Sequence, residues 1–183
     1  MQDNTEFTLT RDCEAIQIPS GDKVTLTAGT QGVITQSLGG SYTIATPIGL
    51  SRITGADADA LGITTAPAAP TKPAGDFKGE VEEKAVWDQL KTCYDPEIPV
   101  NIVDLGLVYD CTVSQSPETG AKVNVKMTLT APGCGMGPTI CAEARSKILT
   151  IPGVGEADVD LVWDPAWNQG MISEVGKMQL GLI

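Results

Sequence analysis

The chain has 183 residues, of which 42% are apolar, and carries a formal net charge of −11. This composition is typical of a folded protein rather than a disordered chain. The acidic charge argues against a nucleic-acid partner because it repels phosphate backbones. No apolar segment approaches the roughly 20 residues that span a bilayer, so no membrane partner is expected. The acidic start at Met1–Asn4 precedes no apolar segment, so we expect no secretory signal and a cytoplasmic location.

Residues 1–65 are predicted to form a small β-rich domain. Short runs rich in β-branched residues recur there, separated by turn sequences such as Pro19–Asp22 and Gly39–Gly40. The runs are Phe7–Thr10, Val24–Thr27, Gly32–Thr35 and Tyr42–Ala45. Their regular spacing favours a small barrel or a rolled sheet. Asp57–Gly62 is expected to add a helical turn that ends at glycine.

The clearest boundary is a stretch dominated by alanine, proline and glycine, Ala66–Gly75. Such a stretch sustains neither a helix nor a sheet ladder, because proline lacks the backbone donor. We therefore predict a linker over residues 66–78, which separates the β-rich domain from a second domain at 79–183.

The second domain is predicted to alternate helix and strand. Helical spacing is seen in Glu80–Thr92 and Pro138–Thr150, with proline at the start of the latter. Apolar residues fall on alternate positions in three predicted strands, which cover residues 105–113, 122–129 and 158–163. Pro117–Gly120 is expected to join the first two strands as a hairpin. This order predicts an α+β fold with helices on one face of a small sheet.

The cysteines and the missing histidines limit the chemistry that is available. The chain has five cysteines, no CxxC pair and no histidine. Zinc-ribbon and thioredoxin sites are excluded by the spacing, and histidine-dependent catalysis by the composition. Soft-metal chemistry would therefore run mainly through thiolates. A cysteine-dependent enzyme, such as a thiol oxidoreductase, is the weakest of the alternatives.

Two segments are candidates for a site. The first is Thr128–Pro138, where a glycine-rich loop follows a strand, presents Cys134 and leads into a helix, whose N-terminus favours a thiolate. The second is Tyr94–Tyr109, which places Asp95, Glu97 and Asp104 between a helix and a strand. Acids near a thiolate would bind iron or receive a proton, whereas the alternative is that they cap backbone N–H groups.

These segments resemble the metal–sulfur cluster biosynthesis family, which acts in iron–sulfur cluster assembly. The matching motifs are Asp95–Pro99, Asp104–Tyr109, Thr128–Thr130 and Pro132–Cys134. Further segments resemble the SufT group of that family, namely Arg11–Ala15, Ile18–Gly21 and Trp163–Asn168. The likeness covers essentially the whole C-terminal domain, and with the SufT motifs it covers nearly the full chain.

The resemblance implies an accessory factor, not an enzyme, that delivers iron–sulfur clusters to client apoproteins. It implies that Cys134 is the key thiol, with Glu97, Asp95, Asp104 and Thr128 near it. Scaffold or carrier proteins and client apoproteins are the implied partners. A cluster typically takes four thiolates, so one exposed cysteine would hold it only transiently, and a homodimer would offer two. The alternative is a metal-free adaptor that docks clients onto other carriers.

The other cysteines and two tryptophans divide between packing and function. Cys141 lies on the apolar face of a predicted helix and Cys111 on that of a predicted strand, so both are expected in the core. For Cys93, which ends a predicted helix beside the acids, packing and function both stay open. Cys13 adjoins Asp12 in the SufT-like motif, so both a metal-binding and a structural role stay open. Trp163 and Trp167 would suit client docking, although packing is the favoured interpretation for Trp163.

Overall fold

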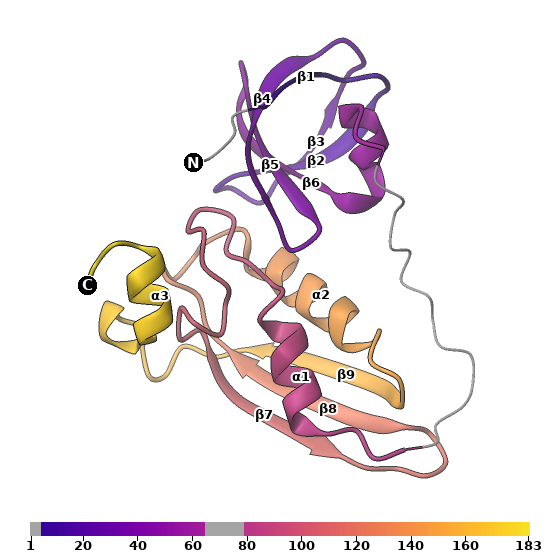
Figure 1. Cartoon of the computed structure of the whole chain (residues 1–183), viewed down its shortest axis with the longest axis vertical. Helices are drawn as coiled ribbons and strands as arrows, with labels where there is room; N and C mark the ends of the chain where they lie inside the picture. The colour runs from indigo at the N-terminus through magenta and orange to yellow at the C-terminus, as the bar shows by residue number, and fades with distance from the viewer. Residues whose placement is uncertain (1–4, 65–78) are drawn as a thin grey trace. The chain divides into compact units, whose positions relative to one another are not determined.

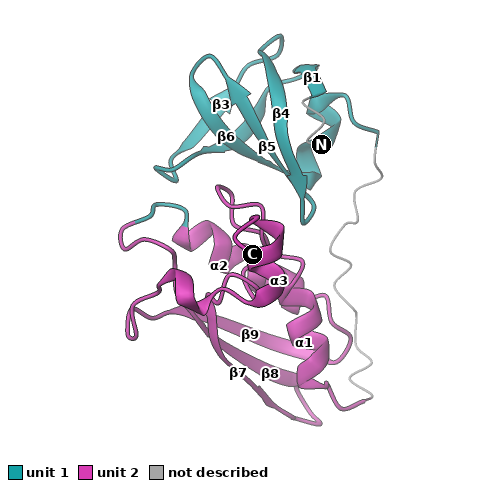
Figure 2. Cartoon of the chain, turned by 60° about the vertical axis from the view of Figure 1, so that its left-hand side comes forward, with its two compact units in different colours: residues 1–69, 134–136 teal, residues 70–133, 137–183 magenta. Residues whose placement is uncertain are grey.

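The computed structural model describes residues 5–64 and 79–183, so the predicted linker at 66–78 lies outside the described residues. The chain divides into two compact units, one formed by Met1–Ala69 with Cys134–Met136 and the other by Pro70–Gly133 with Gly137–Ile183 (Figure 2). The domain boundaries proposed from the sequence stay a prediction. No helix in the described ranges is long and apolar enough to cross a membrane.

The first unit is built on six antiparallel strands that form one sheet in the order β1-β4-β5-β6-β2-β3. The strands are β1 (Thr5–Thr8), β2 (Cys13–Gln17), β3 (Lys23–Leu26), β4 (Gln31–Leu38), β5 (Ser41–Thr46) and β6 (Gly49–Thr54). A short 3-10 helix, η1 (Gly55–Leu61), follows β6 and ends at Gly62, whose φ of 74° suits glycine. The four predicted strands and the helical turn are therefore present, while closure into a barrel is not confirmed.

The core of this unit is made by one apolar side of the strands. Ile44 and Ile53 are fully buried and pack in one cluster with Leu26 and Leu61. Burying an aliphatic side chain of this size contributes about 1.5–3 kcal/mol. Cys13 belongs to the same cluster, with only 4% of its surface exposed.

The second unit is an α+β fold around a three-stranded sheet in the order β7-β8-β9. Its elements are α1 (Glu83–Leu90), β7 (Val108–Ser114), β8 (Ala121–Met127), α2 (Gly137–Ile148), β9 (Val154–Leu161), η2 (Gln169–Met171) and α3 (Glu174–Gln179). Strand β7 is antiparallel to β8, and β9 is parallel to β8. The helix and strand order predicted from the sequence is confirmed, and α3 is an additional element.

Alternation along β8 divides the sheet into two faces. Helices α1 and α2 lie over one face of the sheet (Figure 1). Val123, Val125 and Met127 are fully buried, as expected for side chains on a covered face. Lys122 and Lys126 point to the opposite face, as the period of two requires. Both helices supply apolar stripes to the covered face: Val86 and Leu90 from α1, and Ile140, Ala144 and Ile148 from α2.

Two expectations about packing differ from the structure. Cys141 is only half-buried, because the buried stripe of α2 runs through Ile140 and Ala144. Cys141 follows Ile140 directly and therefore lies beside this stripe, not in it. Trp163 is 47% exposed rather than packed, because β9 ends at Leu161 and no longer directs alternate residues into the core. Trp163 is therefore a surface residue.

Candidate functional site

Cys134 lies in the loop that joins β8 to α2. The strand ends at Met127 and the helix begins at Gly137, so the loop follows directly from the central strand of the sheet. Gly133, just before the cysteine, has a φ of 82°, a conformation that L side chains rarely adopt. The thiol of Cys134 is partly exposed. This loop therefore offers a thiol to a ligand at the end of a buried strand.

Thr128 anchors the start of that loop. Its side chain is buried, and its backbone N–H donates to the carbonyl oxygen of Leu107 at 2.8 Å. Leu107 is the last residue of the acid-containing loop, which spans the residues between α1 and β7. The beginning of the cysteine loop is therefore tied to the end of the acid loop.

Asp95 shapes the acid loop from within. It is buried, and its Oδ1 accepts hydrogen bonds from the backbone N–H groups of Glu97 and Ile98 at 2.8 and 2.9 Å. A carboxylate that accepts two N–H groups closes a tight turn of the chain. This arrangement agrees with the capping alternative that the sequence left open.

Asp104 is held by side chains from two parts of the unit. Its Oδ2 accepts from the amide of Asn101 at 2.7 Å, and its Oδ1 accepts from the hydroxyl of Ser173 at 2.8 Å. Ser173 also caps α3, where its Oγ accepts from the N–H of Gly176 at 3.0 Å. Asp104 therefore fastens the C-terminal helix to the acid loop, a role that leaves both carboxylate oxygens occupied.

Glu97 differs from its two acidic neighbours. Its side chain is exposed, and no hydrogen bond or ion pair engages its carboxylate among the described residues. Of the three acids in the loop, Glu97 is thus the one whose carboxylate is available to a ligand.

Cys13 and its motif are engaged in the structure of the first unit. Arg11 bonds to Asp57 and to Asp59, with N–O distances of 2.8 Å, and Asp12 accepts the backbone N–H of Ala28 at 2.7 Å. Burial in the apolar cluster raises the pKa of the Cys13 thiol. These contacts argue against the metal-binding role that the sequence left open for Cys13, which stays untested.

The remaining thiols are also poor ligands in this state. Cys93 and Cys111 are buried. Burial raises the pKa of Cys111 to about 11, with smaller contributions from Glu83 and Asp110. The pKa of Cys141 is likewise raised to about 11, mainly by burial and then by Asp160. Thiols with such pKa values are protonated at neutral pH, and the thiolate is the form that binds metal.

The candidate residues do not form a complete metal site within the described part of the chain. No group of three or more Cys, Asp, Glu or His side chains there is close enough to hold a metal ion. Within that part of the chain, Cys134 is therefore not joined by two further side chains of these types.

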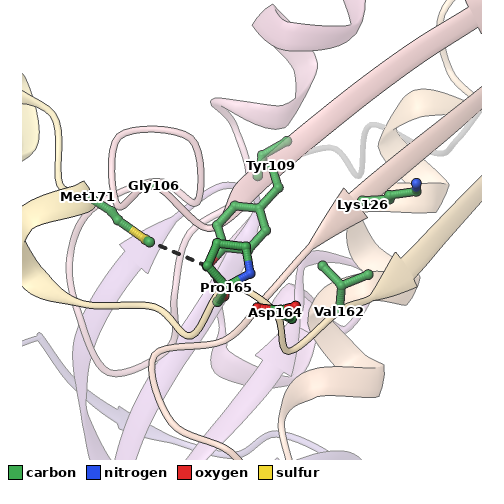
Figure 3. A pocket seen from close by; sticks show the side chains of 8 residues that line it. Gly106, Tyr109, Lys126, Val162, Asp164, Pro165 and Met171 are labelled. Carbon is green, nitrogen blue, oxygen red and sulfur yellow. Dashed lines mark hydrogen bonds between the residues drawn. The ribbon is translucent and has the colours of Figure 1, made fainter.

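A depression of about 710 Å³ lies elsewhere in the second unit, beside Tyr109 (Figure 3). The Tyr109 hydroxyl donates to the carbonyl of Pro165 at 2.8 Å and lies 3.6 Å from the sulfur of Met171. The depression is lined by Gly106, Val108, Tyr109, Lys126, Val162, Asp164, Pro165 and Met171. None of the residues proposed for the site lines it, so the depression is a separate feature.

The sequence interpretation missed the residues that fix the acid loop. Asn101 bonds to Asp104 within the loop. Ser173 and Trp167 bond to the loop from the C-terminal segment, the latter through its ring N–H and the carbonyl of Leu105 at 2.8 Å. A serine followed closely by an acid and a short apolar pattern, as at Ser173, is a helix-start signal that would have located α3. No local signal identifies Trp167 as a partner of a residue 62 positions away.

Comparison with known proteins decides the family. A family model described as iron–sulfur cluster assembly protein matches residues 83–159. A Porphyromonas gingivalis protein named Fe-S protein maturation auxiliary factor is 41% identical over 101 residues, which are 55% of this chain and 92% of the relative. The chain belongs to the iron–sulfur cluster assembly protein family. The resemblance predicted from the motifs is thereby confirmed.

A second relative and a solved structure match a similar part of the chain. The Fe-S protein maturation auxiliary factor SufT of Staphylococcus aureus is 39% identical over 88 residues, which cover 48% of this chain and 96% of the relative. A crystal structure of a domain of unknown function, DUF59, from Bacillus anthracis is 35% identical, with a TM-score of 0.48, and the match covers 55% of this chain and 92% of that chain. These matches account for about half of the present chain.

Proposed function

We propose that this chain is an accessory factor of iron–sulfur cluster assembly that carries clusters to client apoproteins through Cys134. The cluster is cargo, which the chain accepts from a scaffold or carrier protein and passes on. The proposal gives the chain no catalytic residue and treats it as a carrier rather than an enzyme. Glu97 is proposed as a second group of the site, while Asp95, Asp104 and Thr128 keep the surrounding loops in place.

The observation that carries the proposal is the difference between Cys134 and the other four cysteines. Cys13, Cys93 and Cys111 are buried. Cys141 has a pKa of about 11 and stays protonated near neutral pH. Cys134 is partly exposed in a glycine-containing loop between a strand and a helix. It is therefore the thiol that best fits direct contact with a cluster.

A site with one thiolate suits transfer better than storage. Iron–sulfur clusters are typically held by four cysteine ligands, so a single thiolate holds one weakly unless other ligands join it. A homodimer would supply a second Cys134, and a client would supply its own cysteines. Ligand exchange onto the client then needs only the loss of this thiolate, which favours release.

Anaerobic reconstitution tests cluster binding. The intact chain, Cys134→Ser and Cys141→Ser would be incubated with ferrous iron, sulfide and a small thiol, desalted, and measured by visible absorption and Mössbauer spectroscopy. The wild type and Cys141→Ser are expected to retain a cluster, and Cys134→Ser is expected to lose it. Retention by Cys134→Ser at the wild-type level would overturn the assignment of this thiol.

The second candidate is a metal-free adaptor that docks clients onto other carriers. The engagement of Asp95 and Asp104 in hydrogen bonds within their own unit favours it. In this case the wild type retains no iron in the same experiment, yet still binds a client and a carrier together. A wild-type chain that retains stoichiometric iron and sulfide excludes the adaptor.

A further inference from the structure

The three-stranded sheet of the second unit ends at β9. This strand is the last in the order β7-β8-β9 and is parallel to β8 over seven registered pairs, from Ala121↔Val154 to Met127↔Leu161. Within the described residues no strand pairs with its other side. An edge strand presents unpaired N–H and C=O groups to whatever lies beside it, so β9 is a template for another strand.

The side chains of β9 on the open face of the sheet are acidic. Glu156, Asp158 and Asp160 alternate along it and stand in register with Lys122, Asn124 and Lys126 of β8. Lys122 bonds to the carboxylates of Glu156 and Asp158, at 3.0 Å each, although 56% and 42% of these two side chains are exposed. Strand β8 thus shows a pattern that complements this acidic row, with lysines at positions 122 and 126 and asparagine between them on the same face.

A groove follows the same edge on the side of α2. It has a volume of about 270 Å³ and is lined by Asp158, Val159 and Asp160 from β9 and by Cys141, Ala142 and Arg145 from α2. Residues on alternate sides of an added strand would meet different surroundings. Those on the open face would meet carboxylates, and those on the α2 side would meet Cys141, Ala142 and Val159 in a groove whose rim carries Arg145, Asp158 and Asp160.

We propose that the free edge of β9 binds an extended segment of a partner protein as a fourth strand. The segment carries Lys or Arg on the open face, opposite Glu156, Asp158 and Asp160, and small apolar residues on the α2 side. Backbone hydrogen bonds supply affinity and the carboxylates supply selectivity. The acidic row also keeps two copies of this chain from pairing edge to edge, because like charges would then face each other.

This proposal does not depend on Cys134, so the two can fail separately. It concerns which partner segments the chain recognises, whatever the chain carries. Asp110 provides a matched control, because it flanks Lys126 on β7 just as Asp160 flanks it on β9. Both carboxylates are exposed and share one face, and they differ in which edge of the sheet they occupy.

The test is a titration of the isotope-labelled full chain, followed by NMR, with a capped peptide containing Lys-Val-Asn-Val-Lys, the sequence of residues 122–126. Signals of β9 are expected to shift and its amide exchange to slow. Replacing both lysines of the peptide by glutamate should abolish binding. Asp160→Lys should weaken binding about tenfold, and Asp110→Lys less than about twofold, as expected for one reversed partner of an exposed ion pair.

Strand addition is separated from diffuse charge attraction by a second peptide. Methylation of alternate backbone nitrogens removes hydrogen-bond donors but leaves both lysines in place, and it should abolish binding. The proposal is overturned if the wild type does not bind the first peptide. Equal loss of affinity in Asp160→Lys and Asp110→Lys, or undiminished binding of the methylated peptide, would overturn it as well.

Discussion

Cys13 and Cys134 each lie in a motif that resembles the family, but the surroundings of the two motifs differ. Around Cys13, the charged residues hold the unit together: Arg11 bonds to Asp57 and Asp59, and the thiol itself is in the apolar core. Around Cys134, the chain forms a loop with a left-handed glycine and leaves the thiol partly exposed. A cysteine in a motif is therefore best judged by whether its neighbours are already engaged within the fold.

The largest expected contrast is in thiol reactivity. At about pH 8, a thiol with a pKa of about 11, as at Cys141, is ionised in roughly one molecule per thousand. Cys134 is partly exposed and should be alkylated by iodoacetamide faster than Cys141. Because the pKa of Cys141 is raised, its rate should increase as the pH rises toward 11. Mass spectrometry of timed digests measures both rates, and faster labelling of Cys141 would contradict the assignment.

Serine substitution should separate the two motif cysteines by stability. Cys13→Ser places a hydroxyl in an apolar cluster and is expected to lower the free energy of unfolding by about 1–3 kcal/mol. Cys134→Ser should change it by less than about 0.5 kcal/mol, as is usual for exposed positions. Urea unfolding followed by circular dichroism makes the measurement. Equal, small effects would show that Cys13 is not part of the core.

Asp95 and Glu97, two residues apart in the acid loop, show the same contrast between an engaged and an available side chain. Asp95→Ala removes the acceptor of two backbone N–H groups and should cost about 1–2 kcal/mol. Glu97→Ala removes an exposed carboxylate without a hydrogen bond and should cost less than about 0.5 kcal/mol. Thermal or urea unfolding of the two variants decides the point. A larger loss for Glu97→Ala would reverse the roles given to these acids.

The smallest expected effect is functional. Glu97→Gln should reduce cluster delivery several-fold, because Glu97 is the acid that we propose as the second group of the site. Glu82→Gln is the matched control, since Glu82 is also exposed and precedes α1 without capping it through its side chain. Delivery to an apo-ferredoxin, scored by its recovered absorption, compares them. Equal activity of both variants would show that the Glu97 carboxylate has no role in cluster delivery.

The sequence predicted the elements whose apolar residues keep one period. Val123, Val125 and Met127 alternate through β8, and the structure buries all three. Strand β6 escaped notice because its buried positions include the polar Ser51 and Arg52, which hide the alternation. The short helix α3 was missed because its six residues are too few to show an apolar period, although Ser173 gives a helix-start signal.

The candidate site was predictable only in its residue types. The glycine-rich loop and its cysteine are visible in the sequence, as is the cluster of acids. The different roles of those acids depend on contacts in the folded chain. Asp95 closes its own turn, whereas Asp104 accepts a hydrogen bond from a serine of the C-terminal segment. Nothing local distinguishes Glu97 from these two, because its availability depends on what its neighbours contact.

The most direct test of the central claim is cluster transfer from the intact chain. Reconstituted wild type, Cys134→Ser and Cys141→Ser would each be mixed anaerobically with apo-ferredoxin, and holo-ferredoxin would be followed by circular dichroism. We expect transfer from the wild type and from Cys141→Ser, and none above the level of free iron and sulfide from Cys134→Ser. Transfer from Cys134→Ser at the wild-type rate and yield would contradict it.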